Sequence, residues 1–564
     1  MLVGILAGGE AAPGPFTKET MQENSQLSVL VIDPNPGMRS NLQNMLNASN
    51  INKIEYAVNA GTAIRQLSRR PYDIVLCEYD LGGGSAEGQD GQQLLEDLRH
   101  HRLISPWSIF IMLTSEAVYG KVIGAAELAP TDYVLKPFTA ETLGARIARA
   151  LERRAVFLPT YQLLAHGNVR EAIRSASAAE IAHPRHALEF ARLRAELHVN
   201  IKEHGEAEEI YRKVLAYKPL GWAGLGLARA EFAQGRVEEA RETLQTLVAE
   251  HPRLMAAYDL LARCFEAAGN HVQAQKVLEE AVAISPHMVR RLRKLGEVAL
   301  EAGDAAAAEK SFRQVVSKAR YSEFRDPEDH VRLVKALVKR GDVPSANGVI
   351  RDLERSMKAG PETDACVAVA NAALHDAAGN RAAALADLQG AVAAVRSIGS
   401  GSGLSTGLKL GLVRSCLDHR FDQGAQEVMM AVVNDANSGI TSQGALGLFA
   451  EAGRRDLADG VQAQLKAQAQ ILLGVANEKR NMGDVRGAVQ TLIEALHMAP
   501  SNLQVIVAVA GGVLRQIAEL GWDHPLGELC FAQLEKIRAI DAQHPRLEPL
   551  EVEYLAMRRK YGIS

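Results

Sequence analysis

Asp33, Glu78, Thr114 and Lys136 each come directly after a short run of apolar residues. Carboxylates bind hard divalent cations such as Mg²⁺, and a lysine ammonium contacts phosphoryl oxygens as a compact positive charge. A hydroxyl group can donate a hydrogen bond to the same oxygens. Brought together, these four side chains would suit the chemistry of a phosphoryl group.

The apolar runs alternate with amphipathic segments in the first part of the chain. We predict strands over residues 27–32, 54–58, 74–77, 109–113 and 133–135, and helices that begin near residues 36, 60, 91, 117 and 140. This alternation predicts an α/β fold with a doubly wound, five-stranded parallel sheet of the flavodoxin type. In such a sheet the site lies at the carboxyl ends of the strands, where the four polar residues would meet.

The sequence Lys136-Pro137-Phe138, with Thr114 upstream, is the most specific part of this pattern. Together with the acids at the strand ends, it resembles the CheY-like receiver domain of bacterial response regulators. The resemblance covers residues 27–150, about a fifth of the chain.

The resemblance implies a role for each of five residues. Glu78 stands at the position of the phosphoacceptor aspartate, and Asp33 belongs to the acidic pocket. Lys136 contacts the phosphoryl group. Thr114 and Tyr133 form the switch that couples the pocket to the surface made by the last strand and the last helices.

Two positions depart from the family pattern. Pro34 stands where the family usually has a second acid, and Glu78 is one methylene longer than the usual aspartate. Three hypotheses follow: Glu78 pairs with Lys136 and partly mimics the phosphorylated state, the receiver is purely structural, or phosphorylation persists at Glu78 or Asp80. We expect no catalytic residue and no cofactor, apart from a weak Mg²⁺ site at Asp33 and Glu78.

A second pattern follows the first along the chain. Gly235, Gly269 and Gly303 are spaced by 34 residues, and an alanine follows each of them after five residues. Weaker copies precede and follow these three. The pattern resembles tetratricopeptide repeats, in which paired antiparallel helices carry glycine in the turn and a small residue where they cross. It predicts an all-α superhelix of about ten helical hairpins over residues 155–504.

The boundaries of this array can also be predicted. Helical character continues past Leu151, so the last receiver helix is expected to run nearly continuously into the repeats. Residues 397–407 (SIGSGSGLSTG) are the expected hinge between two arms. Residues 505–564 are expected to form polar capping helices, and residues 1–26 a disordered extension that contains an alternative start at Met21.

The first helix of each hairpin would line a concave face that binds peptides or protein surfaces. The residues expected on this face in the strongest repeats are Trp222, Arg229, Arg263, Arg290 and Arg293. The arginines could hold an acidic segment or a C-terminal carboxylate. The alternative is that they simply solvate an exposed helix face, with Glu231, Asp259 and Glu266 as partners inside the chain.

The composition of the chain bears on its expected partners and on the cell compartment in which it is expected to lie. The chain has 564 residues and a formal net charge of -4, so no strong field points to nucleic acid or to an anionic membrane. Its five cysteines are scattered without a CxxC pair, which favours reduced thiols in the cytoplasm. No stretch has the length and sequence of a membrane span, so we expect no insertion into a membrane.

These patterns together predict a non-enzymatic adaptor of a bacterial two-component system. The receiver would present a docking surface to a histidine kinase, a phosphotransfer protein or another receiver, and the repeats would bind an output protein. One alternative is a phosphorylation-independent assembly or chaperone-like scaffold for a surface or motility machine. Another is a phosphorylatable response regulator that acts through protein contacts.

Overall fold

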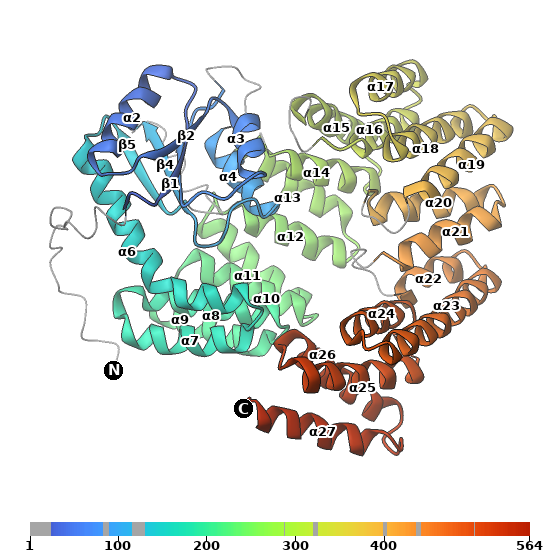
Figure 1. Cartoon of the computed structure of the whole chain (residues 1–564). Helices are drawn as coiled ribbons and strands as arrows, with labels where there is room; N and C mark the ends of the chain where they lie inside the picture. The colour runs from blue at the N-terminus through green and yellow to red at the C-terminus, as the bar shows by residue number, and fades with distance from the viewer. Residues whose placement is uncertain are drawn as a thin grey trace. The chain divides into compact units, whose positions relative to one another are not determined.

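The computed structural model describes residues 24–82, 90–115, 130–286, 288–319, 325–398, 403–435, 442–500 and 502–563. The chain divides into two units, Met1–Arg325 and Asp326–Ser564 (Figure 1). The helix expected near residue 117 and most of the N-terminal extension lie outside the described residues, as do residues 399–402 of the expected hinge.

The first unit begins with a five-stranded sheet in the order β2-β1-β3-β4-β5, in which all neighbouring strands are parallel. The strands are β1 (Ser28–Ile32), β2 (Lys53–Ala57), β3 (Ile74–Glu78), β4 (Ile109–Ser115) and β5 (Asp132–Lys136). The predicted parallel sheet is confirmed. The carboxyl ends of its strands bring Asp33, Glu78, Thr114 and Lys136 to one edge of the sheet, as expected from their positions after the apolar runs.

Four described helices cover the sheet: α2 (Pro36–Ala48), α3 (Ala60–Leu67), α4 (Gly91–His100) and α6 (Ala140–Ala165). Successive residues of a strand face opposite sides, so Val75 and Leu76 belong to different cores. Val75 packs with residues of α3 and α4, and Leu76 with residues of α2 and α6. Helix caps fix where α2 and α4 begin, since Asn35 and Asp90 accept hydrogen bonds from backbone amides of the first turn.

Helix α6 joins the sheet to the helical array without a break. It is 26 residues long, and its first half packs on the sheet through Leu143 and Ile147. Its second half contributes Phe157, which stacks on Phe190 of the array at 4.1 Å between ring centroids. The expected continuity between the last receiver helix and the repeats is therefore present.

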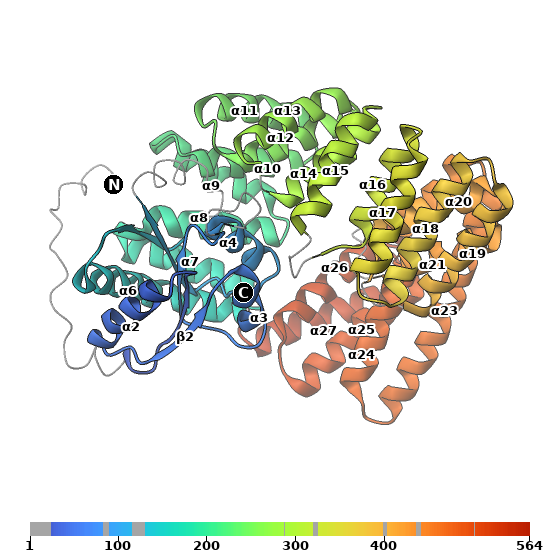
Figure 2. The same cartoon turned by 90° about the horizontal axis from the view of Figure 1, so that it is seen from above.

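The array of the first unit consists of antiparallel helical hairpins (Figures 1 and 2). Its elements after α6 are α7 (Val169–Ala182), a short 3-10 turn (Pro184–His186), α8 (Ala187–Asn200), α9 (His204–Tyr217), α10 (Gly221–Ala233), α11 (Val237–Glu250), α12 (Met255–Ala267), α13 (His271–Ile284), α14 (Val289–Glu301) and α15 (Ala305–Ala319).

The second unit continues the pattern. Its helices are α16 (Glu328–Lys339), α17 (Val343–Ser356), α18 (Pro361–Ala377), α19 (Arg381–Ile398), α20 (Thr406–Asp418), α21 (Asp422–Val433), α22 (Ser442–Glu451), α23 (Arg455–Asn481), α24 (Val485–Met498), α25 (Leu503–Leu520), α26 (His524–Ile540) and α27 (Leu547–Lys560). The expected all-α superhelix of tetratricopeptide type is thus observed in both units.

A left-handed residue ends the helix that precedes each predicted turn. The glycines with positive φ at these turns are Gly167, Gly235, Gly269, Gly303, Gly341, Gly379, Gly453 and Gly483. At two further turns the position is taken by Lys202 (φ 63°) and Arg420 (φ 57°). A residue with a Cβ adopts this conformation at a cost, and these two repeats lack the glycine of the pattern.

Helix α23 departs from the expected arrangement. We predicted separate hairpins around Gly453 and Gly483, but one helix of 27 residues, α23, fills the whole interval between them (Figure 1). The two turns are 30 residues apart, which is shorter than the repeat period of 34, and no proline interrupts the interval. The two hairpins therefore share this helix.

The hinge expected at residues 397–407 stays a prediction, because residues 399–402 lie outside the described residues. The division between units falls at Arg325 and Asp326, and α20 belongs to the second unit. The start of α20 is bound to α16, because the backbone amide and the hydroxyl of Ser405 both donate to the carboxylate of Glu328 at 2.5 Å. Burial, followed by the charge of Asp326, raises the pKa of Glu328.

Residues after 503 form the helices α25, α26 and α27 around one hydrophobic core. Within the part of the chain that the structure describes, α25 is the one helix whose length and hydropathy would allow it to cross a membrane. Its apolar face packs into this core, in which the buried residues of α25 are Val505, Ile506, Val509, Ala510, Val513, Leu514 and Ile517.

Candidate functional site

Asp33, Glu78, Thr114, Tyr133 and Lys136 form the strand-end pocket at the carboxyl edge of the sheet. The Lys136 ammonium makes an ion pair with the Glu78 carboxylate, and its Nζ lies 3.5 Å from Asp33 Oδ2. The Asp33 side chain is 2% exposed and that of Glu78 14%. Solvent screens these charges poorly, so each carboxylate depends on Lys136 for compensation.

Backbone amides add to this compensation. The amide of Asn35 donates to Asp33 Oδ1 at 2.8 Å, and the amide of Asp80 donates to Glu78 Oε1 at 3.2 Å. Asp80 lies beyond the end of β3 and accepts a hydrogen bond from the amide of Gly82. Its carboxylate therefore belongs to the loop and not to the ion pair at Lys136.

Thr114 and Tyr133, which we expected to form the switch, lie on the neighbouring strands β4 and β5. Thr114 is fully buried, and its hydroxyl donates weakly to the carbonyl of Ser115 at 3.4 Å. Tyr133 is partly buried and packs against the core that contains Cys77 and Met112. Burial, and then the charge of Glu78, raises the pKa of the Cys77 thiol well above its usual value, so this thiol is inert.

The pocket fits Mg²⁺ poorly. Mg²⁺ demands six oxygen ligands in near-ideal octahedral geometry, whereas Asp33 and Glu78 both already face Lys136. Pro34 has no side-chain donor, and its carbonyl accepts a hydrogen bond from Arg39 at 3.0 Å. Among the described residues, no group of three or more His, Cys, Asp or Glu side chains could hold a metal ion.

The sheet domain contacts the first array at a junction that the sequence did not predict. Arg290 of α14 donates to Nδ1 of His100, at the end of α4, across 3.2 Å. Trp107 and Tyr161 lie with ring centroids 6.1 Å apart, and Arg154 of α6 donates to Asp73 at 3.0 Å. Partners so distant along the chain leave no periodic signal in the sequence.

Charges at this junction are shifted by burial. Burial, and then the charge of Arg290, lowers the pKa of His100 and of His101. Burial, and then the charge of Arg192, lowers the pKa of Arg99. The end of α4 therefore lies in a positively charged environment, in which protonation of either histidine is disfavoured.

The five residues expected on the concave face all have interactions within the described part of the chain. Arg290 contacts His100, the guanidinium of Arg263 lies 4.9 Å from the ring centre of Phe232, and Trp222 lies under Arg192. Arg229 and Arg293 have interactions within the described chain as well. Binding of an acidic segment by these arginines remains a prediction, and the contact at Arg290 leaves less of that face open.

The acids that we expected to balance these arginines pair with other cations. Arg291 makes two hydrogen bonds to Asp259, each of 2.8 Å. Lys294 lies 2.6 Å from Glu266, and Arg212 lies 3.4 Å from Glu231.

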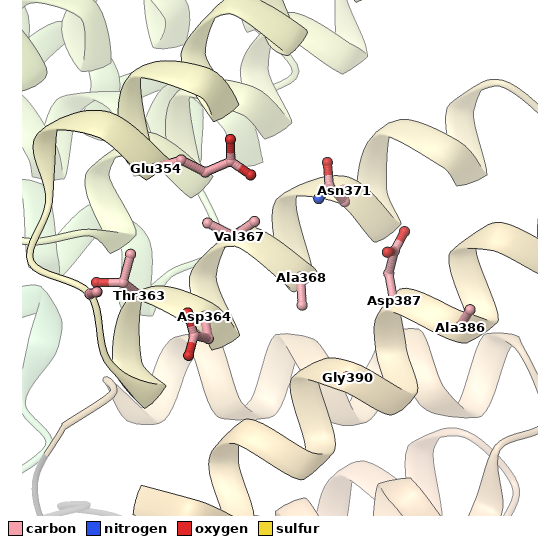
Figure 3. A pocket seen from close by; sticks show the side chains of 10 residues that line it. Glu354, Thr363, Asp364, Val367, Ala368, Asn371, Ala386, Asp387 and Gly390 are labelled. Atoms are coloured by element: carbon pink, nitrogen blue, oxygen red, sulfur yellow. The ribbon is translucent and has the colours of Figure 1, made fainter.

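A cavity of about 420 Å³ lies among α17, α18 and α19 of the second unit (Figure 3). It is lined by Glu354, Ala359, Thr363, Asp364, Val367, Ala368, Asn371, Ala386, Asp387 and Gly390. The lining holds three acids and no base. A ligand at Asp387 would compete with His375, whose Nδ1 lies 2.6 Å from the carboxylate of Asp387. Sequence reasoning did not single out this hollow.

Comparison with protein families assigns both parts of the chain. Residues 29–148 match the response regulator receiver domain, and residues 162–221, 225–289 and 266–326 match tetratricopeptide repeats. The chain therefore contains a receiver domain followed by tetratricopeptide repeats, as the sequence motifs predicted.

Individual proteins are similar to parts of this chain. The chemotaxis protein CheY-3 of Vibrio cholerae is 28% identical over 130 residues, which cover 23% of this chain and 95% of that protein. The chemotaxis protein CheY of Pseudomonas aeruginosa is 27% identical, over 22% of this chain and 98% of that protein. A tetratricopeptide repeat protein from Parabacteroides merdae is 16% identical, with a TM-score of 0.32, over 47% of this chain and 98% of that chain.

Proposed function

Since a receiver domain is fused here to tetratricopeptide repeats, we propose that the protein is a signalling adaptor of a two-component system that works without accepting a phosphoryl group. The receiver would dock on a histidine kinase, a phosphotransfer protein or another receiver. The repeats would hold an output protein. No reaction is required of the chain in this role, and its effect would come from which partners it brings together.

The ion pair between Lys136 and Glu78 is the observation that supports this proposal. In a phosphorylated receiver, the lysine would contact the new negative charge on the acceptor. Here the longer side chain of Glu78 places a permanent carboxylate against the lysine. The pocket would thus be held close to the state that phosphorylation produces, with Thr114 and Tyr133 beside it.

Helix α6 and the junction at His100 support transmission from the receiver to the repeats. A change at the strand ends would reach the array through a continuous helix and through the contact between α4 and α14. Both connections lie within the first unit. The surface that the repeats present would therefore depend on the state of the receiver.

A phosphotransfer experiment tests the proposal. The full chain is incubated with acetyl phosphate and Mg²⁺, and its intact mass is measured for wild type, Glu78→Asp and Glu78→Gln. We expect no mass increase for wild type or Glu78→Gln. A phosphoryl group on Glu78→Asp would indicate that only the acceptor has been lost, whereas no gain on any variant would indicate a pocket that serves docking alone. A stable phosphoryl group on wild type would overturn the proposal.

A binding experiment tests the mimicry separately. The affinity of the full chain for purified histidine kinases and phosphotransfer proteins is measured for wild type, Glu78→Gln and Asp80→Asn. We expect Glu78→Gln to weaken binding, because it removes the charge that Lys136 contacts. Asp80→Asn is the matched control, since Asp80 belongs to the loop. Equal effects of the two substitutions would contradict a role for the charge on Glu78.

A further inference from the structure

Helix α27, the last of the second unit, has one covered face and one bare face (Figure 1). Leu547, Leu550 and Tyr554 are buried against α25 and α26. On the opposite face Val552 is 62% exposed and Leu555 49% exposed. Single exposed apolar residues need no explanation, but these two are neighbours at helical spacing on the same face.

Opposite charges flank the two apolar residues in a symmetrical order. Glu548 lies four residues before Val552, and Arg559 lies four residues after Leu555. At this spacing all four side chains share one stripe of the helix. Both charged residues are exposed, and among the described residues neither has an ion-pair partner. The stripe begins with a negative charge, continues with two apolar residues and ends with a positive charge. Read in the opposite direction, it has the same order with the two charges exchanged.

This order is complementary to itself in the antiparallel direction. When two copies of α27 lie side by side in opposite directions, Glu548 of each faces Arg559 of the other. Val552 of each then faces Leu555 of the other at the centre. A two-fold axis relates the two helices in this arrangement, so that both chains use the same surface patch.

We propose that a second copy of this chain covers the bare face of α27, so that the protein dimerises through its C-terminal helix. The charge order is what identifies the occupant as a second copy, since an unrelated partner would not require that symmetry. One helix pair buries less surface than the roughly 800 Å² per partner of a standard interface. The dimer is therefore weak, with dissociation in the micromolar range.

Sedimentation velocity of the full chain over micromolar concentrations tests the proposal. We expect wild type to move from monomer to dimer as concentration rises, and Leu555→Glu to remain monomeric. Leu555 is exposed, so this substitution leaves folding intact, and the melting temperature checks this point. A wild type that stays monomeric throughout the range would overturn the proposal, because the bare face would then be empty or covered within one chain.

Charge exchange identifies the partner more sharply. Glu548→Lys and Arg559→Glu should each weaken the dimer by roughly tenfold, because each turns two attractions across the interface into repulsions. The double variant should recover wild-type affinity, since its stripe is again self-complementary. A mixture of the two single variants should dimerise better than either alone. A double variant that stays weak would mean that the face binds something other than a second copy.

Discussion

Opposite charges form an ion pair in the strand-end pocket but are held apart on the bare face of α27. In the pocket, residues from three separate strands bring Lys136 against Glu78 and close to Asp33. On α27, Glu548 and Arg559 are eleven residues apart on one helix, about 16 Å along its axis, and cannot meet. The charges of the strand-end pocket are paired within one chain and stabilise its fold. The charges on α27 can pair only with those of another molecule, which in our proposal is a second copy of the chain.

The comparison predicts that removing a charge costs the most where its partner is least exposed. Lys409 and Asp435 form the extreme case, with Nζ and Oδ2 2.8 Å apart and side chains 4% and 8% exposed. Lys409→Met should lower the free energy of unfolding of the second unit by about 3–5 kcal/mol, because it removes the cation that pairs with a buried carboxylate. Denaturant unfolding measures the loss.

The double variant Lys409→Met/Asp435→Leu is the control for this prediction. Replacing both members of a buried pair with apolar groups is often close to neutral, so most of the stability should return. A loss of less than about 1 kcal/mol in the single variant would show that the pair is better solvated than its exposure indicates.

The strand-end pocket should show a smaller effect of the same kind. Lys136→Met leaves Asp33 and Glu78 without their shared cation, and Lys136 itself is 23% exposed. We expect the receiver to lose about 2–3 kcal/mol, between the values for buried and for surface pairs. Amide exchange of β1, β3 and β5 reports the loss. Glu78→Gln, which keeps Lys136 beside Asp33, should lose less, and a reversed order would contradict the assigned pairing.

The ion pair of Arg154 with Asp73 should contribute less again. The Asp73 side chain is 38% exposed, so a double-mutant cycle with Arg154→Ala and Asp73→Asn should give a coupling of about 0.5–1 kcal/mol. Burial raises the pKa of Asp73, but hydrogen bonds from Ser28 and Arg154 outweigh burial and the net pKa is lowered. The coupling should therefore be complete above the ordinary carboxyl pKa and fade as the pH falls below it.

The contact between His100 and Arg290 should have the smallest effect, and it should depend on pH. The pKa of His100 is lowered in the folded chain. The state in which the receiver docks on the array therefore binds fewer protons than the state in which it does not. Docking should be complete above the ordinary histidine pKa of about 6.5 and weaken below it. Fluorescence of Trp107 at the same junction, with Trp222 and Trp522 replaced by Phe, follows this change. His100→Asn should reduce the pH dependence, and an unaltered profile would assign the titration elsewhere.

Local rules explain why so much of the architecture could be predicted from sequence. The parallel sheet follows from the alternation of apolar runs with amphipathic segments, and the turns follow from glycines such as Gly235 and Gly269 that adopt positive φ. The pairing of Lys136 with Glu78 followed from their positions at two strand ends. Each of these inferences needed only residues close in sequence or an established strand order.

Contacts between distant segments explain what could not be predicted. The hydrogen bonds from Ser405 to Glu328 and the contact of His100 with Arg290 join residues 77 and 190 positions apart. Neither contact has a sequence motif. At two turns the left-handed residue is Lys202 or Arg420 instead of glycine, so the repeat pattern there lacks its glycine.

The continuity of α6 has a practical consequence for exchanging parts of this protein. Sequence similarity to receivers ends at residue 148, but α6 continues to Ala165, with Arg154 bound to Asp73. A chimera joined at residue 150 would splice two foreign half-helices and discard that ion pair. The natural seam is the turn at Gly167, so a transplanted receiver should carry the whole of α6 with it.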